Sequence, residues 1–496
     1  MSVSPKSSVP GVRVRATNDA DARSDGSHVL YWMTAARRTR HNFGLQRAVD
    51  WARELKKPLV VLEAVRVGYR WASDRHHAFL LAGMADNQAA LEKRGVAYHA
   101  YVEPKPDAGK GLLAALAKDA CVVVADDWPC FFLPRMLAAA SEQVPVRMEA
   151  VDSNGLLPIR AVDKAFARAY DLRRVMQREL GAHLQARPKA DPLAGPRLEP
   201  HPGIPAAIQK RWPAASGDLL AGRGLDALPI DHDVAPVSWS GGPEAGAREL
   251  KRFASNGLAR YGQERGQVDV SSGLSGHLHY GHVGAHQVFD AVASAEDWSL
   301  DALGDPRETK GSREGWWGMS PGAEAFLDQI ATWRELGLNM CAFQPGYERY
   351  DTLPDWALAT LSEHASDERP YLYTLDQLDA AETHDDIWNA AQRQLVRDGR
   401  IENYLRMLWG KKVLHWTESP EQGYDVLVEL NNRYAVDGRD PNSYTGIRWT
   451  FGAFDRPWGP ERDVFGKVRY MTSDSTRRKL KLDAYLERWG PEGSLF

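Results

Sequence analysis

Three tryptophans in two neighbouring segments form a pattern that could belong to a cofactor site. Trp388 lies in THDDIWNAAQRQLV, and Trp409 and Trp416 lie in IENYLRMLWGKKVLHW. Leu405, Trp409 and Trp416 recur at i, i+4 and i+11, so they would share one stripe of a helix. Such a stripe is more often part of a helical core than of a cofactor site. The chain has 17 Trp, 12 of them after residue 235, which fits a large helical core, stacking surfaces or an electron-transfer chain.

A glutamine and a tryptophan four residues apart could recognise a nucleobase. Gln329 and Trp333, in FLDQIATWRELGLNMC, would lie on one face of a helix. An amide suits the edge of a base and an indole suits its face. The same spacing also fits a core tryptophan beside a surface glutamine, and the residues alone leave both interpretations open.

The segment ARYGQERGQVDVSSGLSGHLHYGHVG, residues 259–284, could bind a phosphate. It places small hydroxyl residues and a glycine before the start of a helix, where backbone N–H groups attract anions. The alternative is a plain helix cap formed by Ser271 or Ser275.

The segment NNRYAVDGRDPNSYTGIRW, residues 431–449, is too polar for a core and too rich in turn residues for a helix. We expect a long charged loop that ends in an aromatic ring, with helices on both sides. From residue 431 to residue 481 there are eleven Lys/Arg against six Asp/Glu, a local charge of about +5, although the whole chain carries −4. A basic segment on an acidic body is typical of nucleic-acid binding, and also of an ordinary solvated surface.

The elements before residue 180 predict an α/β fold with a parallel sheet. Strand patterns alternate with helical ones, and the expected strands are 29–33, 58–65, 96–102, the run CVVVADDWP and the run VPVRMEAV. Asp126 and Asp127 follow a strand, at the edge where such sheets bind ligands. The chain has no glycine-rich dinucleotide fingerprint after its first strand.

The remaining segments predict four regions. Residues 1–27 are polar, lack the apolar stretch of a signal peptide and are expected to form a disordered tail. An α/β domain over 28–180 is followed by a connector rich in Pro, Gly and Ala over 181–243. Helical periodicity dominates 244–496, which predicts an all-α domain. The expected helices there are 244–265, 275–295, 321–343, 354–366, 374–397, 400–418, 421–434 and 475–488.

Composition narrows the class of protein. Hydrophobic residues make up 43% and charged residues 26%, as in an ordinary globular protein. There is no apolar run long enough for a transmembrane helix. Three scattered Cys are too few for a disulfide framework or a zinc site, so we expect the reducing cytoplasm.

Taken together, these segments resemble the photolyase/cryptochrome flavoproteins, and most closely the class II cyclobutane pyrimidine dimer photolyases. The resemblance covers about residues 28–490. Its motifs are LYWMTAARRTRHNFGLQRA, PDWALATLSEHASDERPYLYTLDQL, THDDIWNAAQRQLV, YLRMLWGKKVLHWTESP, LNNRYAVDGRDPNSYTGIRW and DRPWGPERDVFGKVRYM. It implies an α/β antenna domain, a connector and a helical domain that holds FAD.

The resemblance also implies roles for individual residues around FAD. Arg406 would pair with Asp437 beside the flavin ring, and Asn431 would face flavin N5. The implied cofactor-binding residues are Tyr261, Arg265, Ser271, Ser272, Gly273, Leu274, Ser275, Arg406, Asn431, Asp437, Gly438 and Arg439. Trp409, Trp388 and Trp416 would pass electrons to light-excited FAD, with Tyr373 and Tyr404 as helpers.

For the substrate, the resemblance implies UV-damaged DNA and a flipped-out thymine dimer. Trp333 and Trp449 would enclose the dimer, with Met407 and Gln329 touching it. The implied phosphate contacts are Arg448, Arg456, Arg462, Lys467 and Arg469. An antenna of the 8-hydroxy-5-deazaflavin type could lie near Asp126, Asp127 and Trp128, and a monomer is the expectation.

Several positions depart from the class II pattern. Gln329 stands where the family has Glu, and an amide cannot give a proton to the dimer. SGHLHYGHVG, RELGLNMC, ENY and Phe454 also differ from the expected residues. These changes concern the substrate more than the fold or FAD. The sequence therefore supports light-dependent dimer repair, and as an alternative a cryptochrome-like blue-light receptor or a photolyase for another lesion; a helical protein without flavin is the third hypothesis.

Overall fold

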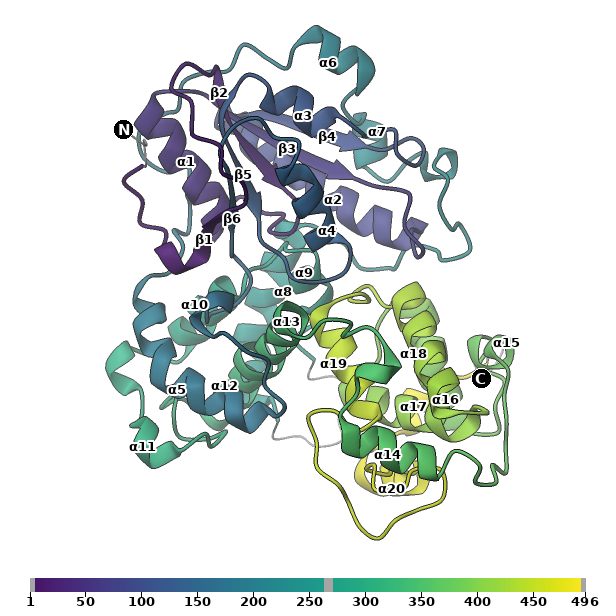
Figure 1. Cartoon of the computed structure of the whole chain (residues 1–496). Helices are drawn as coiled ribbons and strands as arrows, with labels where there is room; N and C mark the ends of the chain where they lie inside the picture. Colours follow the sequence, from purple (N-terminus) through teal and green to yellow (C-terminus); the bar gives the residue numbers. More distant parts are fainter. Residues whose placement is uncertain (1–4, 263–270, 492–496) are drawn as a thin grey trace. The chain divides into compact units, whose positions relative to one another are not determined.

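The computed structural model describes residues 5–262 and 271–491 (Figure 1). The chain divides into two compact units. Unit 1 comprises residues up to 163 with 178–254 and 273–301, and unit 2 comprises 164–177, 255–272 and the chain from 302 onwards. The two units interleave along the chain, so their bounds differ from the predicted boundaries near 180 and 243. The division into antenna domain, connector and FAD-binding domain stays a prediction.

Unit 1 is built on a six-stranded sheet in the order β1-β6-β5-β2-β3-β4. All neighbouring strands are parallel except β1 and β6, which are antiparallel. This confirms the predicted parallel α/β fold. The strands are β1 (Val14–Ala16), β2 (His28–Met33), β3 (Leu59–Val65), β4 (Ala97–Val102), β5 (Ala120–Asp126) and β6 (Met148–Val151).

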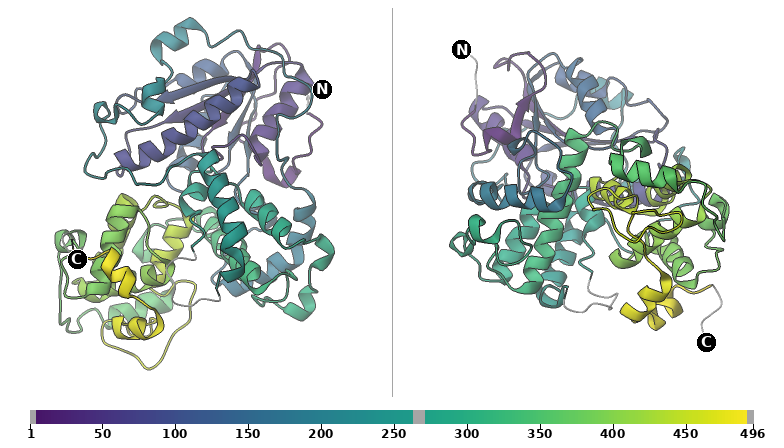
Figure 2. Two further views of the ribbon diagram at one scale, coloured as in Figure 1. Left: turned by 180° about the vertical axis from the view of Figure 1, so that it is seen from behind. Right: turned by 60° about the horizontal axis from the view of Figure 1, so that its bottom comes forward.

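Helices cover both faces of this sheet, as Figures 1 and 2 show. Successive side chains of a strand point to opposite faces. In β2, Val29 and Tyr31 pack in one apolar core with helix α1, whereas Leu30 and Trp32 pack in a second core with α3. The helices before the connector are α1 (Phe43–Leu55), α2 (Asp74–Lys93), α3 (Leu112–Ala117), α4 (Leu133–Ser141) and α5 (Ala169–Gln185).

The N-terminal segment is more ordered than its composition predicts. β1 pairs with the edge strand β6, and the side chain of Arg13 is buried, where it donates to the carbonyl oxygens of Asp152, Gly155 and Leu156. The expectation of a disordered tail over 1–27 is therefore wrong for this part of the segment. The polar composition suggested that chain entropy would keep this segment disordered. Sheet pairing and a buried guanidinium with three carbonyl partners offset that entropy.

The segment that links the sheet to the helical region is mostly irregular. Between α5 and α8 the structure has only short helical pieces, α6 (Ala206–Arg211), α7 (Gly217–Leu220) and a 3-10 turn at Leu225–Ala227. Three further helices follow, α8 (Pro243–Asn256), α9 (Ser275–His279) and α10 (Ala285–Ala295), and all but the last two residues of α8 belong to unit 1.

Among its described residues, the named secondary-structure elements of unit 2 are all helices, which confirms the predicted all-α region. Its helices from residue 306 on are α11 (Pro306–Thr309), α12 (Pro321–Leu327), α13 (Arg334–Phe343), α14 (Asp355–Glu363), α15 (Leu375–Asp379), α16 (Asp386–Asp398), α17 (Asn403–Trp416), α18 (Pro420–Tyr434), α19 (Pro441–Thr450), α20 (Ser473–Lys479) and α21 (Asp483–Arg488). A π-helical turn, Asp328–Trp333, joins α12 to α13.

The prediction of a long loop over 431–449 is wrong. The first four residues of this segment finish α18, and 441–450 form helix α19, so only 435–440 connect the two. The Asp440 carboxylate accepts from the backbone N–H of Asn442, and Pro441 occupies the first helical position. An acidic cap followed by proline is a strong helix start, and it outweighs the turn-forming residues that predicted a loop. Among the helices described, none is both long and apolar enough to cross a membrane.

Candidate functional site

The three predicted electron-transfer tryptophans form a continuous buried line in unit 2. The rings of Trp388 and Trp409 are nearly parallel, with centroids 6.4 Å apart, and the Trp388 and Trp416 centroids lie 5.7 Å apart, edge to face. Each of the three indoles is at most 3% exposed. Helix α16 supplies Trp388 and helix α17 supplies the other two. Ring contacts of this kind allow electrons to pass between the indoles.

Hydrogen bonds fix the indoles of this line. The Trp388 Nε1–H donates to the Trp409 carbonyl oxygen, and the Trp409 Nε1–H donates to Oε1 of Gln392, both at 3.0 Å. Gln392 is fully buried on α16. Sequence analysis missed it, although it lies four residues after Trp388, the spacing that places two side chains on one helix face.

Only one of the two predicted tyrosine helpers meets this line in the described part of the chain. The Tyr373 ring lies edge to face with Trp416, at 5.4 Å. The Tyr404 hydroxyl instead accepts from Lys479 Nζ of α20 at 3.2 Å. The structure therefore extends the line of indoles toward Tyr373 and not toward Tyr404.

The residues assigned to the flavin ring come together where α17 faces the end of α18. Arg406 donates to the Asp437 carboxylate at 3.1 Å, the pairing that the resemblance implied. Asn431, in the last turn of α18, is 3% exposed, and its amide donates to Oδ1 of Asn432 at 3.2 Å. A neutral buried amide and an ion pair thus stand on adjacent elements.

Asn432 holds the 435–440 loop in place. Its Oδ1 also accepts from the Arg439 backbone N–H at 2.8 Å, and its carbonyl oxygen accepts from the Arg439 guanidinium at 2.6 Å. Arg439 has a φ of +65°, and a Cβ at Gly438 would lie 2.8 Å from the Asn431 carbonyl oxygen. The loop therefore needs glycine at 438. Asn432 escaped sequence analysis, because its neighbour Asn431 matched the family pattern.

The predicted phosphate-binding residues divide between the two units. Tyr261, Ser271 and Ser272 belong to unit 2, and Gly273, Leu274 and Ser275 to unit 1. Arg265 lies outside the described residues. The Tyr261 ring meets Phe326 edge to face at 5.3 Å, and burial raises its pKa to about 12, so its hydroxyl keeps its proton at neutral pH.

Gln329 and Trp333 lie in the π-helical turn, and they are the two residues of that turn that are not buried. Such turns occur often at functional sites. The predicted shared face is thus a partly exposed one, so Trp333 is not a plain core residue. Met407 is likewise half-buried, on α17.

Trp449, on α19, belongs to an alternating series of cations and indoles that we call the cation–indole ladder. Lys411 Nζ lies 4.7 Å from the Trp449 ring centroid. The Arg469 guanidinium lies 5.6 Å from the Trp449 ring centroid and 4.1 Å from the Trp458 ring centroid, and the Arg456 guanidinium lies 4.7 Å from the Trp458 ring centroid. Asp455 pairs with Arg469 at 2.7 Å and accepts from the Trp458 Nε1–H.

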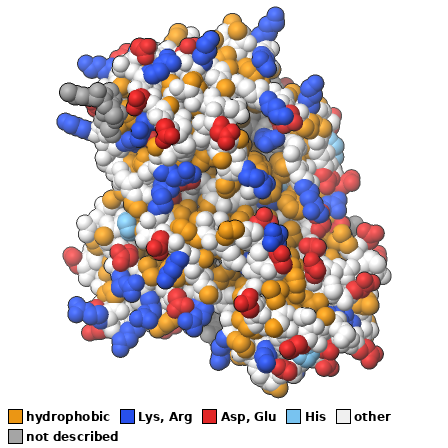
Figure 3. Space-filling view, in the orientation of Figure 1, with side chains coloured by type: hydrophobic (Ala, Val, Ile, Leu, Met, Phe, Trp, Pro, Cys, Tyr) orange, Lys and Arg blue, Asp and Glu red, His pale blue; other side chains and the backbone are white. Residues whose placement is uncertain are grey.

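The predicted phosphate contacts differ sharply in exposure. Arg456, Arg462 and Lys467 are exposed, and Lys467 pairs with Glu461 at 2.9 Å. The prediction that Arg448 contacts a phosphate is wrong, because its side chain is 1% exposed and donates to the carbonyl oxygens of Tyr347 and Thr352. It holds that turn and is not available to a phosphate. Basic and acidic side chains are interspersed on the face shown in Figure 3.

The two acidic residues at the end of β5, Asp126 and Asp127, have partners within unit 1. One oxygen of Asp126 accepts from the backbone N–H groups of Thr34, Ala35 and Ala36, at 2.8–2.9 Å. Asp127 pairs with Arg15 and Arg160. β2 and β5 flank the point where the strand order reverses, the usual ligand crevice of such sheets. Here the Asp126 carboxylate occupies that position.

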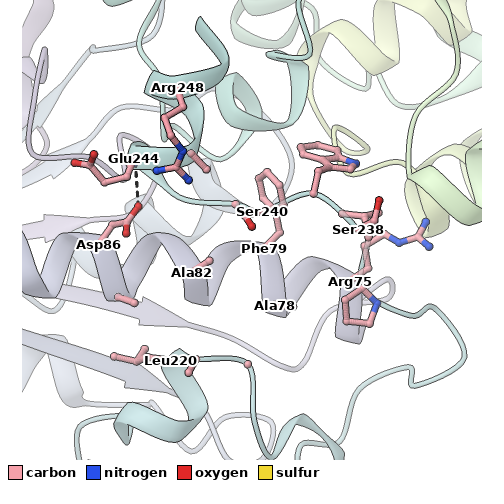
Figure 4. Close-up of a pocket in the computed structure, with 18 residues that line it drawn as sticks. Arg75, Ala78, Phe79, Ala82, Asp86, Leu220, Ser238, Ser240, Glu244 and Arg248 are labelled. Carbon is pink, nitrogen blue, oxygen red and sulfur yellow. Dashed lines mark hydrogen bonds between the residues drawn. The ribbon is translucent and has the colours of Figure 1, made fainter. Parts of the chain in front are cut away.

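Unit 1 also contains a pocket of about 440 Å³ that no sequence pattern indicated (Figure 4). It lies between α2, α8 and residues 236–241. The Phe79 and Trp239 rings meet edge to face at 4.9 Å, and Asp86 accepts from the Glu244 backbone N–H, the dashed line in Figure 4. Aromatic, acidic and basic side chains, the last from Arg75 and Arg248, therefore share its lining.

Comparisons with known proteins place these features in a family context. The chain is 31% identical over 480 residues to a deoxyribodipyrimidine photo-lyase of Methanothermobacter thermautotrophicus, which covers 96% of this chain and 97% of that protein. Proteins of the same name are 30% identical in Oryza sativa subsp. japonica, over 98% of this chain and 93% of that protein, and 28% identical in Potorous tridactylus, over 97% and 84%.

A solved structure shares the fold. The crystal structure of a bacterial class III photolyase from Agrobacterium tumefaciens matches with a TM-score of 0.68 and 17% sequence identity, over 94% of this chain and 86% of that one. No protein-family model matches the chain.

Proposed function

Since this chain belongs to the photolyase family, we propose that it repairs cyclobutane pyrimidine dimers in DNA with light and FAD. Two curated relatives at 30–31% identity carry the name deoxyribodipyrimidine photo-lyase, and the similarity spans nearly the whole of both chains. The observation that carries the proposal is the buried line of Trp409, Trp388 and Trp416. A flavin that acts in its reduced state needs such an electron supply.

The unit 2 residues assigned to FAD fit this cofactor in their chemistry. Asn431, at the end of α18, offers a buried neutral amide. Arg406 and Asp437 form an ion pair between the adjacent elements, α17 and the 435–440 loop. Gly438 leaves no room for a side chain and keeps the loop close to α18. When bound and reduced, FAD supplies the electron that splits the dimer under light. The protein residues position the flavin, exclude water and, through Tyr261, donate a hydrogen bond from a phenol that stays protonated.

The half-buried side chains of the helical unit would receive the flipped dimer. Trp333 and Trp449 each offer an aromatic face, and stacking contributes roughly 1–3 kcal/mol per base. A damaged pair costs less to unstack than an intact one, so flipping itself favours the lesion. Gln329, one turn before Trp333, would hydrogen-bond the edge of the dimer, and Met407 would touch it.

DNA backbone contacts would come from the exposed cations Arg456, Arg462 and Lys467, with Arg469 behind them. Lys467 and Arg469 already pair with Glu461 and Asp455, so phosphates compete with these carboxylates. We expect affinity for DNA to fall steeply with salt. The protein acts on DNA as a monomer in the cytoplasm under this proposal.

A second candidate function is a cryptochrome-like blue-light receptor, or repair of another lesion. The observation that favours it is Gln329 in the place of the expected glutamate. Under either function an antenna of the 8-hydroxy-5-deazaflavin type would add an absorption band beside that of FAD. Asp126 and Asp127 already have protein partners, so such an antenna would need hydrogen-bonding groups other than these carboxylates.

A repair assay tests the proposal. The purified protein is photoreduced and mixed with an oligonucleotide that contains a thymine dimer, then illuminated with near-ultraviolet light beside a dark sample. Restored thymine absorbance in the light alone is the expected result. Bound FAD that photoreduces normally without restored thymine would instead support the receptor or another lesion. Absence of any bound flavin would contradict both.

A further inference from the structure

The line of indoles does not end at Trp416 but continues to a tyrosine whose hydroxyl touches a histidine. Tyr373 lies edge to face with Trp416, and its backbone N–H donates to the Trp416 carbonyl oxygen at 3.0 Å. The Tyr373 hydroxyl lies 2.7 Å from Nδ1 of His384, and the His384 backbone N–H donates to the same hydroxyl oxygen at 3.0 Å. The phenol is therefore held from both sides.

This contact matters because tyrosine cannot lose an electron easily unless it also loses its proton. A free phenol has a pKa near 10, so at neutral pH it remains protonated and the proton must leave during oxidation. A base within hydrogen-bond reach allows both transfers to occur together. Nδ1 of His384 is at that distance from the phenol, and it can accept the proton when the other ring nitrogen carries the hydrogen.

The surroundings keep the imidazole able to accept a proton. Partial burial lowers the pKa of His384, a trend that Asp385 opposes and Lys412 reinforces. Asp385 and Lys412 pair with each other at 3.2 Å, and Asp385 also accepts from the Ser473 hydroxyl, so this carboxylate is already engaged. His415, on α17, is a further titratable neighbour, and burial lowers its pKa to about 4.

The other side of His384 leads to solvent. The Tyr371 ring stacks on the imidazole at 3.8 Å and is 47% exposed, and His384 is itself exposed. A proton that reaches His384 can therefore pass to water. The arrangement connects a fully buried indole to the surface through one phenol and one imidazole.

We propose that His384 accepts the phenolic proton when Tyr373 reduces oxidised Trp416. One electron passes from Tyr373 to the Trp416 radical cation, which returns to a neutral indole. The O–H bond of Tyr373 breaks and an N–H bond forms at His384 Nδ1, which leaves a neutral tyrosyl radical and an imidazolium. The imidazolium then releases a proton to water. In the enzyme the oxidation of Trp416 rests on the proposed function, because light-excited FAD would draw the electron through Trp409 and Trp388.

Loss of the phenolic proton leaves a neutral tyrosyl radical, which would make the charge separation longer-lived. Return of the electron to the tyrosyl radical is slow because a proton must return to the phenoxyl oxygen with it. The transfer is expected to slow as pH falls through the pKa of His384, because a protonated imidazole cannot accept. Its lowered pKa places this loss on the acidic side of neutrality.

The test uses the purified full-length protein and oxidises its tryptophans without light, so its outcome does not depend on photolyase activity. Azide radicals from pulse radiolysis oxidise tryptophans, and absorption follows the passage of the radical from indole to phenol. Tyr373→Phe identifies the share of the tyrosyl signal that arises at Tyr373. His384→Ala should slow formation of the Tyr373 radical by on the order of 100-fold to 10,000-fold, the scale of a lost general base. The same substitution should also remove the pH dependence of the rate at which the Tyr373 radical forms.

Three further results separate proton transfer from a structural role. Added imidazole should restore the rate in His384→Ala, because the exposed site admits a free base. His415→Gln, a matched histidine on the helix of Trp416, should leave rate and pH profile unchanged. An unchanged rate and pH profile in His384→Ala would overturn the proposal in favour of water as the acceptor. An unchanged tyrosyl signal in Tyr373→Phe would overturn it too, because Tyr373 would then not be the donor.

Discussion

Lys411 lies against the ring of Trp449, with 4.7 Å between Nζ and the ring centroid, and it is completely buried. Its ammonium also donates to the Thr450 carbonyl oxygen. Burial lowers the pKa of Lys411 to about 7, with Asp455 opposing and Arg469 reinforcing the shift. A cation–π contact is strongest when the cation is desolvated, so the protonation of Lys411 bears directly on how firmly Trp449 is held.

Lys411→Met should change how stability depends on pH. In the unfolded chain a lysine keeps its proton up to about pH 10, whereas Lys411 in the fold loses it near pH 7. The unfolded state thus binds more protons between these values, and this residue makes the free energy of unfolding rise with pH there, by up to roughly 1.4 kcal/mol per pH unit. Urea unfolding across this range should show a flatter profile for Lys411→Met than for the wild type.

The exposed Lys481 offers the control, since Lys481→Met removes a lysine without emptying a buried site. Identical pH profiles for Lys411→Met and the wild type would show that Lys411 keeps its proton in the fold. If Trp449 contacts the dimer, Lys411→Met should also weaken binding of damaged DNA more than of intact DNA.

Trp388→Phe should separate flavin photoreduction from repair. Trp388 is the middle indole of the line, so the variant should lose nearly all light-driven reduction of FAD. Once its flavin is reduced chemically, it should repair dimers as the wild type does, because the dimer receives its electron from FAD. Flavin absorption under light, and repair after chemical reduction, give the two readouts. Trp298→Phe, in unit 1 beside Phe289, is the control; full photoreduction in Trp388→Phe would mean another electron path.

Periodicity and strand composition were sufficient to predict five of the six strands, β2 to β6, and the helical region. The local sequence pattern gave the wrong prediction for residues 441–450, where a single helix cap decides the structure. In α19 the turn residues suggested a loop, whereas the pair Asp440-Pro441 starts a helix. The capping rule could have identified that start from the sequence, and with it the helical positions of Arg448 and Trp449.

Burial of individual charges could not be predicted from the sequence. Lys411 and Lys412 are neighbours with the same side chain, yet one is buried against Trp449 and the other pairs with Asp385. Arg448 looked like a surface cation because its segment is basic, but its carbonyl partners lie about a hundred residues earlier, at Tyr347 and Thr352. Helix rotation and distant contacts set these environments, and neither is visible in a local window.

Asn432→Ala should destabilise the loop that carries Asp437. Asn432 is fully buried, and its side chain accepts from the Arg439 backbone N–H and meets the Tyr444 hydroxyl at 3.4 Å. Losing these partners leaves buried polar groups unsatisfied, which costs about 1–3 kcal/mol each. We expect a lower free energy of unfolding and faster loss of FAD on dilution.

The exposed Asn442, on α19, provides the comparison. Asn442→Ala removes the same amide from a solvated position and should change unfolding and flavin retention little. Equal effects of the two variants would contradict the role assigned to Asn432. Chemical unfolding and the absorbance of retained flavin measure the two consequences separately.

Gln329→Glu should raise the repair yield per absorbed photon. Gln329 and Trp333 are the two residues of the π-helical turn that are not buried, so a carboxyl group at 329 would meet the same ligand surface as the amide. A protonated glutamic acid can donate both a hydrogen bond and a proton to the reduced dimer, whereas the amide can give only the hydrogen bond. One mismatched hydrogen bond costs roughly 1–3 kcal/mol, so the gain can be large.

Gln329→Leu, which removes hydrogen bonding at similar volume, should lower the yield below that of the wild type. Repair per photon and affinity for dimer-containing DNA are measured for all three proteins. A yield that is the same in all three would show that residue 329 does not touch the lesion.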